Sequence, residues 1–165
     1  MTFEEFVNSR LTAMLRYATM LTQDPHTATD VVQETMIRVH LKWPRVVASG
    51  APERYVRRML TNVFLDSRRV SWLRRVTLRG DPVEPPGIPD HADGVAERDR
   101  VWALLGTLAP RQRAAVVLRY YEGLADEEIA DVLGCEVGTV RGQISRALAT
   151  LRTRLAPAHS TGGER

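Results

Sequence analysis

Apolar residues recur along this chain at intervals of three and four positions. No stretch in which apolar and polar residues alternate is long enough to predict a β-strand. A spacing of three and four positions places side chains on one face of an α-helix, so the pattern predicts an all-α protein. The segment 80–94 breaks the pattern with four prolines and three glycines, a composition typical of a linker. We therefore expect two small helical domains, at 1–79 and 95–156, each with its own compact core. A disordered tail is expected at 157–165.

The N-terminal domain is predicted to contain three helices. The first spans about 2–21, and the second runs from about 27 to Trp43, where Pro44 ends it. A loop is expected over 45–51, and Pro52 then occupies the first position of the third helix, where proline is favoured. The second and third helices each have an apolar stripe, whose members are Ala28, Val31, Val32, Met36, Val39 and Trp43, then Tyr55, Val56, Met59, Leu60, Val63 and Phe64.

The C-terminal domain is predicted to contain four helices. One ends near Leu108, the next runs from Pro110 to about Gly123, and two more span 126–133 and 137 to about 155. The apolar residues that mark the first two are Val101, Leu104, Leu105, Leu108, Val116, Val117 and Tyr120.

The last two helices have the pattern of a helix-turn-helix, over Glu127–Leu148. Ala130 is small enough for a close helix crossing, and Gly134 suits the left-handed residue that ends a helix. Residue types that reach phosphates and base edges are left on the outer face of the second helix: Thr139, Arg141, Gly142, Gln143, Ser145 and Arg146. The pattern predicts a helix placed in the DNA major groove, and the alternative is a helical hairpin without a DNA role.

Charge is distributed unevenly although the net charge is only +3. Residues 52–79 hold eight arginines and two acidic residues, whereas 81–94 hold four acidic residues and no lysine or arginine. Of 23 basic residues only Lys42 is a lysine, a bias that a GC-rich genome would also produce. Arginine suits phosphate binding through its planar fork, and the clustering is not explained by codon usage.

The sequence does not indicate a metal site, a membrane segment or a catalytic motif. Cys135 is the single cysteine, and it and the four histidines lack metal-ligand spacing. No apolar run approaches a membrane span, and the acidic N-terminus does not resemble a signal peptide. No nucleophile–base pair or phosphate-binding glycine loop is evident. We therefore expect a cytoplasmic protein that is not an enzyme and that has no catalytic residues, metal or cofactor.

Several motifs together resemble the sigma-70 family of bacterial sigma factors. Leu108-Ala-Pro-Arg-Gln-Arg-Ala114, Leu118-Arg-Tyr-Tyr-Glu-Gly-Leu124, Glu128-Ile-Ala130 and Cys135-Glu-Val-Gly-Thr-Val-Arg141 are similar to sigma region four. The resemblance implies that this domain binds the −35 promoter element, and Arg119, Arg141 and Arg146 match the DNA-contacting positions of the family. Together with Thr139, Gln143 and Ser145 from the outer face, they form the predicted −35 site. Glu136 and Gly142 depart from the family pattern, so the −35 sequence preference does not carry over.

The second helix resembles the motif by which sigma region two binds the clamp helices of the largest polymerase subunit. The motif is Asp30-Val-Val-Gln-Glu-Thr-Met-Ile-Arg-Val-His40. Five residues share one face of that helix opposite its core stripe: Asp30, Gln33, Glu34, Ile37 and Leu41. A face exposed only to solvent would rarely carry two aliphatic residues, so we expect it to bind a partner.

The third helix carries an arginine-rich face opposite its core stripe, formed by Arg54, Arg57, Arg58, Thr61, Asn62, Arg68 and Arg69. By itself this face could be solvated charge. The resemblance implies that it lies along the melted −10 element, and that the segment 45–51, whose polar members are Arg45 and Ser49, captures a flipped base of the non-template strand.

The resemblance covers about 1–155, and the absence of further regions points to the compact extracytoplasmic-function (ECF, group 4) type. It implies a factor that binds core RNA polymerase, through the clamp helices and the flap of the second subunit, and that binds promoter DNA as duplex and as melted strand. An anti-sigma factor is a further partner common in the family, whereas a small-molecule substrate and direct membrane binding are not expected.

The resemblance also implies that the acidic linker enters the polymerase channel, where it would mimic the charge of RNA phosphates. The alternative is that the linker is only a solubilising spacer. For the whole chain two alternatives stay open, namely a stand-alone helix-turn-helix regulator and a sigma-like interaction protein without promoter use.

Overall fold

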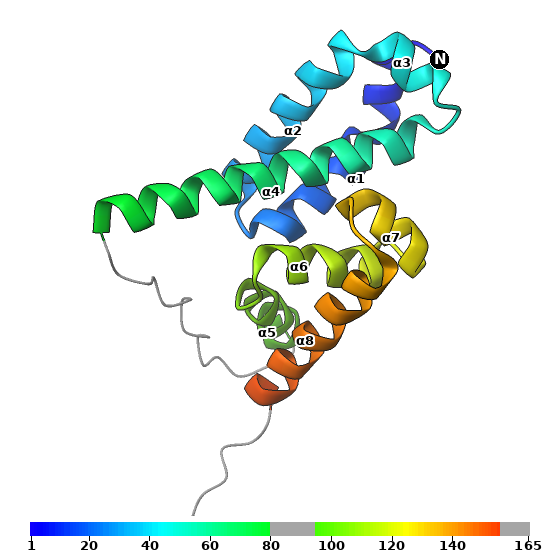
Figure 1. Ribbon diagram of the computed structural model, residues 1–165. Helices are drawn as coiled ribbons and strands as arrows, with labels where there is room; N and C mark the ends of the chain where they lie inside the picture. Colours follow the sequence, from blue (N-terminus) through cyan, green and yellow to red (C-terminus); the bar gives the residue numbers. More distant parts are fainter. Residues whose placement is uncertain (80–94, 156–165) are drawn as a thin grey trace, which may run out of the picture.

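The computed structural model describes residues 1–79 and 95–155, and every regular element within these ranges is a helix (Figure 1). The all-α prediction is confirmed. The predicted linker at 80–94 and the predicted tail at 157–165 lie outside the described residues.

The first two helices begin at strong caps. Helix α1 (Phe3–Thr22) starts with a capping box in which the Thr2 and Glu5 side chains each bind the other's backbone N–H. Helix α2 (Pro25–Leu41) starts at Asp24, whose carboxylate accepts a hydrogen bond of 3.0 Å from the Thr27 N–H. A hydrogen bond from the Thr27 hydroxyl to the same carboxylate, together with the one from the Thr27 N–H, lowers the pKa of Asp24 below its usual value. These caps keep α1 and α2 as separate helices despite their close spacing in sequence.

The segment after α2 differs from the prediction. Helix α2 ends at Leu41, and a short helix α3 (Trp43–Ala48) follows in which Pro44 lies in the first turn. The prediction of a loop over residues 45–48 is therefore wrong. Proline lacks only an N–H that the first turn of a helix leaves unpaired, so Pro44 starts α3 as readily as it ends α2. Buried Val46 anchors α3 to α1 and α4.

Helix α4 (Pro52–Arg79) is the longest element. Val56, Leu60, Val63 and Phe64 of its predicted stripe are buried. Figure 1 shows its N-terminal half lying between the other N-terminal helices and the C-terminal ones, while its C-terminal half projects beyond them.

The C-terminal helices are α5 (Val95–Gly106), α6 (Pro110–Val116), η1 (Val117–Tyr121), α7 (Asp126–Leu133) and α8 (Val137–Leu155). Gly134 ends α7 with φ 64°, as predicted. The π-helical η1 was not predicted. Val101 and Tyr120, two of the apolar residues that marked these helices in the sequence, are 53% and 62% exposed. Tyr120 lies within η1, where wider turns shift side chains away from the positions that an α-helix would give them.

The largest cluster of buried apolar residues joins the two halves of the chain. This cluster contains Tyr17, Leu21 and Phe64 from the N-terminal helices together with Leu118 and Ile129 from the C-terminal ones. The expectation that each half packs only around its own core is therefore wrong for this cluster. Two smaller clusters do belong to one half each, one around Phe6 and Val46 and the other around Leu105 and Ala147. A shared core buries more apolar surface than two small cores could bury separately.

Buried Arg113 links the two halves by hydrogen bonds. Its guanidinium donates to the carbonyls of Leu105, Gly106 and Leu108 around the end of α5, and to the Leu21 carbonyl at 2.7 Å. Burial, with a smaller effect from nearby Arg68, lowers the pKa of Arg113 to about 10, so Arg113 remains charged at neutral pH. No helix in the described ranges is long and apolar enough to cross a membrane.

Candidate functional site

The five residues predicted to bind a partner all lie exposed on one side of α2. Asp30, Gln33 and Glu34 are accompanied by Ile37 and Leu41, which are 59% and 76% exposed. Val31, Val32 and Val39 on the other side of α2 are buried. The Glu34 carboxylate accepts a hydrogen bond of 2.8 Å from Arg38 Nε. The helix thus presents carboxylates and aliphatic side chains together, a combination suited to a protein partner.

Two arginines of the predicted −10 surface contact a carboxylate of α7. The Arg54 guanidinium lies 3.1 Å from Asp131 Oδ2, and Arg58 Nη1 lies 3.4 Å from Oδ1. These pairs are more than one third exposed on both sides, so each contributes little to stability. These ion pairs nevertheless engage the guanidinium groups of Arg54 and Arg58, which were predicted to bind DNA.

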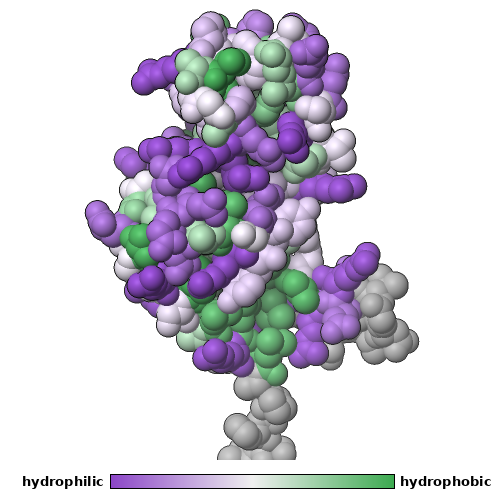
Figure 2. Space-filling view, turned by 90° about the vertical axis from the view of Figure 1, so that its right-hand side faces the viewer, coloured by the Kyte–Doolittle hydropathy of each residue, from purple (hydrophilic) through white to green (hydrophobic). Residues whose placement is uncertain are grey.

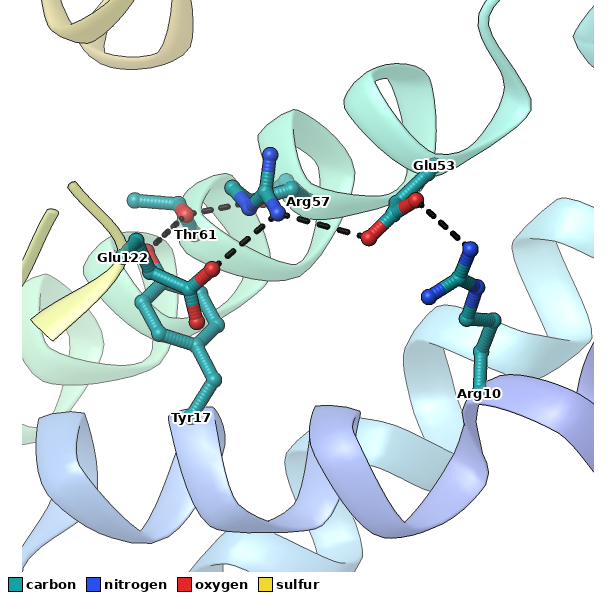
Figure 3. A network of polar contacts seen from close by, with 6 residues as sticks. All are labelled: Arg10, Tyr17, Glu53, Arg57, Thr61 and Glu122. Carbon is teal, nitrogen blue, oxygen red and sulfur yellow. Dashed lines mark hydrogen bonds and ion pairs between the residues drawn. The ribbon is translucent and has the colours of Figure 1, made fainter. Parts of the chain in front are cut away.

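A third arginine, Arg57, belongs to a chain of ion pairs at the junction of the two halves (Figure 3). Arg57 Nη2 lies 3.0 Å from Glu122 Oε2 and 3.6 Å from Glu53 Oε1, and Glu53 also pairs with Arg10. Arg57 and Glu122 are each less than one fifth exposed. This pair therefore connects α4 to the residue that follows η1 at a mostly buried position.

Thr61 lies beneath this chain of ion pairs rather than on an open face. It is fully buried, its hydroxyl donates to the Arg57 carbonyl, and its oxygen lies 2.7 Å from the Tyr17 hydroxyl. Since the Thr61 proton is used, Tyr17 is the donor of the second bond. Burial raises the pKa of Tyr17 well above its usual range, which keeps that proton in place. The structure thus places Thr61 away from solvent, contrary to its predicted position on a DNA-facing surface.

The remaining residues of the predicted −10 surface differ from one another in exposure and in their contacts. Asn62 and Arg69 are exposed. Arg68 donates a hydrogen bond of 2.9 Å to the Thr22 carbonyl, and its guanidinium lies over the Phe64 ring. In the preceding segment Arg45 is exposed, while the Ser49 hydroxyl donates to the Val46 carbonyl.

The predicted −35 surface is assembled on α8 and η1. Thr139, Arg141, Ser145 and Arg146 are exposed, and Gln143 is half-buried, whereas Val140 and Ile144 on the same helix are buried. Gly142 lies under the Arg146 guanidinium, whose nearest atom would be 3.5 Å from a Cβ at that position. The outer face of α8 is therefore open and basic, as predicted.

Three carboxylates that the sequence did not single out contact predicted DNA-binding arginines. Glu122 and Asp131 contact those of α4, and Asp126 contacts Arg119 and Arg141. In the sequence, the acidic residues at 126–128 indicate only the start of a helix. These pairs join residues that are 7 to 77 positions apart. Their formation depends on how the helices pack, and no local signal in the sequence identifies it.

Comparisons with known proteins agree with this arrangement. The family described as Sigma-70 region 2 matches residues 6–76, and that described as Sigma-70, region 4 matches 98–151. The RNA polymerase sigma-E factor of Streptomyces avermitilis is 36% identical over 156 residues, covering 93% of this chain and 84% of that protein. The ECF RNA polymerase sigma factor SigL of Mycobacterium tuberculosis is 33% identical over 144 residues, covering 85% and 81%.

Solved structures share the fold. The sigma factor RpoE of Bartonella quintana, solved in complex with the anti-sigma factor NepR, matches with a TM-score of 0.73 at 24% identity, covering 92% of this chain and 94% of that one. CnrH, solved in complex with the cytosolic domain of CnrY, matches with a TM-score of 0.58 at 23% identity, covering 93% and 86%. This chain belongs to the sigma-70 family, in its ECF group, and is a sigma factor that binds core RNA polymerase and directs transcription initiation at promoters.

Proposed function

We propose that three surfaces divide the work of this sigma factor. The outer side of α2 binds the clamp helices of the largest polymerase subunit, the arginine face of α4 binds the melted −10 element, and the outer face of α8 with Arg119 binds the −35 duplex. The observation that carries the proposal is the α2 surface, where Ile37 and Leu41 are exposed beside three polar residues. A solvated helix face does not require those two aliphatic side chains, whereas a partner would bury them.

The −10 assignment rests on charge and position. Arg54, Arg57 and Arg58 project from one side of α4 and already pair with carboxylates. A nucleic-acid phosphate offers the same oxygen geometry to a guanidinium. The DNA strand would therefore take the places of Asp131 and Glu122, so binding along α4 requires the C-terminal helices to move away from it. Asn62 and Arg69 extend the same surface toward the projecting end of α4.

Protein partners of the C-terminal helices are also part of the proposal. Val101 on α5 and Leu155 at the end of α8 are about half exposed, and Figure 2 shows hydrophobic surface gathered where α8 ends. This surface suits the flap of the second polymerase subunit. We extend the proposal to control by an anti-sigma factor, because two structures with the same fold were solved bound to an anti-sigma factor or to CnrY.

The proposal keeps the predicted boundaries. Residues 1–79 bind polymerase and the −10 element, 80–94 connect them to the −35-binding residues 95–156, and 157–165 form a tail. The factor works in the cytoplasm, where polymerase and promoters are, and catalyses no step itself.

Site-specific photocrosslinking in a reconstituted complex tests the three surfaces together. Benzoylphenylalanine is introduced at Gln33, Asn62 or Ser145 of the full chain, which is then combined with core polymerase and a promoter fragment. We expect crosslinks to the largest subunit, to the non-template strand near −10 and to the −35 duplex, respectively. The exposed residue Glu4 of α1 is the control position and should give none of these products. Crosslinks at another DNA or polymerase site would contradict the assignment of the surface concerned.

A further inference from the structure

Asp126 lies at the centre of the proposed −35 surface, where three elements meet. It is the first residue of α7, and its two carboxylate oxygens point to different helices. Oδ1 is 3.1 Å from Arg119 Nη2 on η1, and Oδ2 is 3.3 Å from Arg141 Nε on α8. We infer that Asp126 is a positioning residue for −35 recognition, which holds Arg119 and Arg141 in one arrangement before DNA binds. The inference rests on the proposed role of these arginines.

The burial of the three side chains supports this role. The Asp126 side chain is 13% exposed, whereas those of Arg119 and Arg141 are 37% and 66% exposed. The carboxylate therefore lies inside and the guanidinium groups extend outward from it. Oδ1 is buried and makes no hydrogen bond, so its contact with Arg119 is an ion pair without hydrogen-bond alignment. Leaving this oxygen in a dry position is costly unless a cation stays beside it.

The contacts leave the DNA-binding atoms of the arginines available. Asp126 accepts from Nε of Arg141, so the two terminal nitrogens of that guanidinium remain for a base edge or a phosphate. Arg119 is held through Nη2, which leaves its other nitrogens. Arginine makes its most discriminating contacts with two parallel hydrogen bonds. Such contacts need a fixed orientation of the guanidinium plane.

The π-helical segment is an independent feature of the same site. Arg119 is the middle residue of η1, which closes with a bond from the Glu122 N–H to the Val117 carbonyl at 3.0 Å. Short π-helical segments occur preferentially at functional sites and redirect the side chains that they carry. Here the redirected side chain is the one that pairs with Asp126.

A carboxylate at this position has two opposing effects on DNA binding. Its negative charge weakens attraction to any phosphate backbone. Its contacts restrict two long side chains that would otherwise lose rotamer freedom on binding. Asp126 should therefore increase the discrimination between DNA sequences while lowering affinity for unrelated DNA.

The test compares Asp126→Asn with Glu127→Gln in the full-length chain. Glu127 is the next residue of α7, is exposed, and forms no ion pair among the described residues, so both variants lose one charge from the same helix turn. A preferred duplex is first selected from a random pool by the wild-type chain. Affinities for this duplex and for a scrambled one are then measured by fluorescence anisotropy at fixed salt, and melting temperatures confirm folding.

We expect Asp126→Asn to reduce the ratio of the two affinities by about tenfold, the effect of one well-oriented contact, with affinity for the scrambled duplex unchanged or higher. Glu127→Gln should keep the ratio within about twofold of wild type. In an Arg141→Ala background, Asp126→Asn should have a much smaller effect on the ratio, because the two residues act together.

Two results would overturn the inference. One is a wild-type ratio in Asp126→Asn, and the other is an equal loss of affinity for both duplexes with a lower melting temperature, which indicates only a structural role. If the wild-type chain selects no duplex at all, the proposed −35 function fails and the inference fails with it. If the wild-type chain selects a duplex and the variant keeps its preference, only the inference about Asp126 is wrong.

Discussion

Arg57 on α4 and Glu122 after η1 form an ion pair of 3.0 Å between two residues that are 65 positions apart. Each side chain is less than one fifth exposed, and the Tyr17–Thr61 hydrogen bond lies beside them (Figure 3). The pair therefore joins the N-terminal helices to the C-terminal helices, at the edge of the core that they share.

Breaking this pair should destabilise the packing of the C-terminal helices against α4. Glu122→Ala leaves Arg57 without its nearer carboxylate in a largely buried position, so we expect the free energy of unfolding to fall by about 1–3 kcal/mol. Urea denaturation followed by circular dichroism measures it. Glu136→Ala, at an exposed glutamate in the helix-turn-helix turn, serves as the control and should change stability by less than about 0.5 kcal/mol. Equal effects of the two variants would show that the Arg57–Glu122 pair does not hold the halves together.

Replacing the carboxylate that pairs with Arg54 and Arg58 by a positive charge should drive α7 away from α4 and expose the arginine face of α4. Asp131→Arg places a third positive charge against both residues, and the free chain should then bind a labelled single-stranded oligonucleotide about tenfold more tightly at low salt. Glu127→Arg makes the same charge change on α7 away from this contact, so it isolates the effect of net charge. Similar affinities for the two variants would mean that α7 does not restrict access to α4.

Substitution of Arg113 should lower the free energy of unfolding more than substitution at most other positions. Arg113→Met keeps much of the side-chain volume but removes the guanidinium donor from four carbonyl groups, at Leu21, Leu105, Gly106 and Leu108. We expect a loss of about 3 kcal/mol or more in unfolding free energy. Exposed Arg111 in the same helix gives the matched control, Arg111→Met. A variant at Arg113 as stable as the control would contradict the structural role described above.

The sequence predicted those features of the fold that depend on neighbouring residues. Gly134, Pro52 and Pro110 indicated helix boundaries that the structure confirms, because caps and proline act within one turn. Pro44 was misread because proline both ends one helix and begins another, and only packing of Val46 decides between these outcomes. The π-helical turn around Arg119 had no local signal.

The site was predicted unevenly for the same reason. Helical periodicity placed Ile37 and Leu41 on one exposed face of α2, and it placed Arg141 and Arg146 on the outer face of α8. Periodicity did not show that Thr61 is covered, because the covering groups come from α1 and from the C-terminal half of the chain. Roles of individual residues in binding remain predictions.

Charge reversal on α2 should weaken polymerase binding without unfolding the chain. Glu34→Arg breaks an exposed pair with Arg38 that contributes less than about 1 kcal/mol to stability. It also opposes any basic partner surface, so we expect affinity for core polymerase to fall by about tenfold or more in a pull-down titration. Glu4→Arg on α1 applies the same charge change elsewhere on the surface. Retention of full polymerase affinity by the Glu34 variant would show that the α2 surface does not bind polymerase.

Run-off transcription with purified core polymerase and a library of genomic fragments measures whether this chain starts transcription at specific promoters through the arginines of α4 and α8. The wild-type chain should yield transcripts from a restricted set of promoters. An Arg54→Ala/Arg58→Ala double variant and Arg146→Ala should each lose most of these transcripts while still binding core polymerase. The absence of promoter-dependent transcripts from every fragment would show that the chain does not direct initiation, and transcripts unaffected by these substitutions would show that α4 and α8 do not bind the promoter.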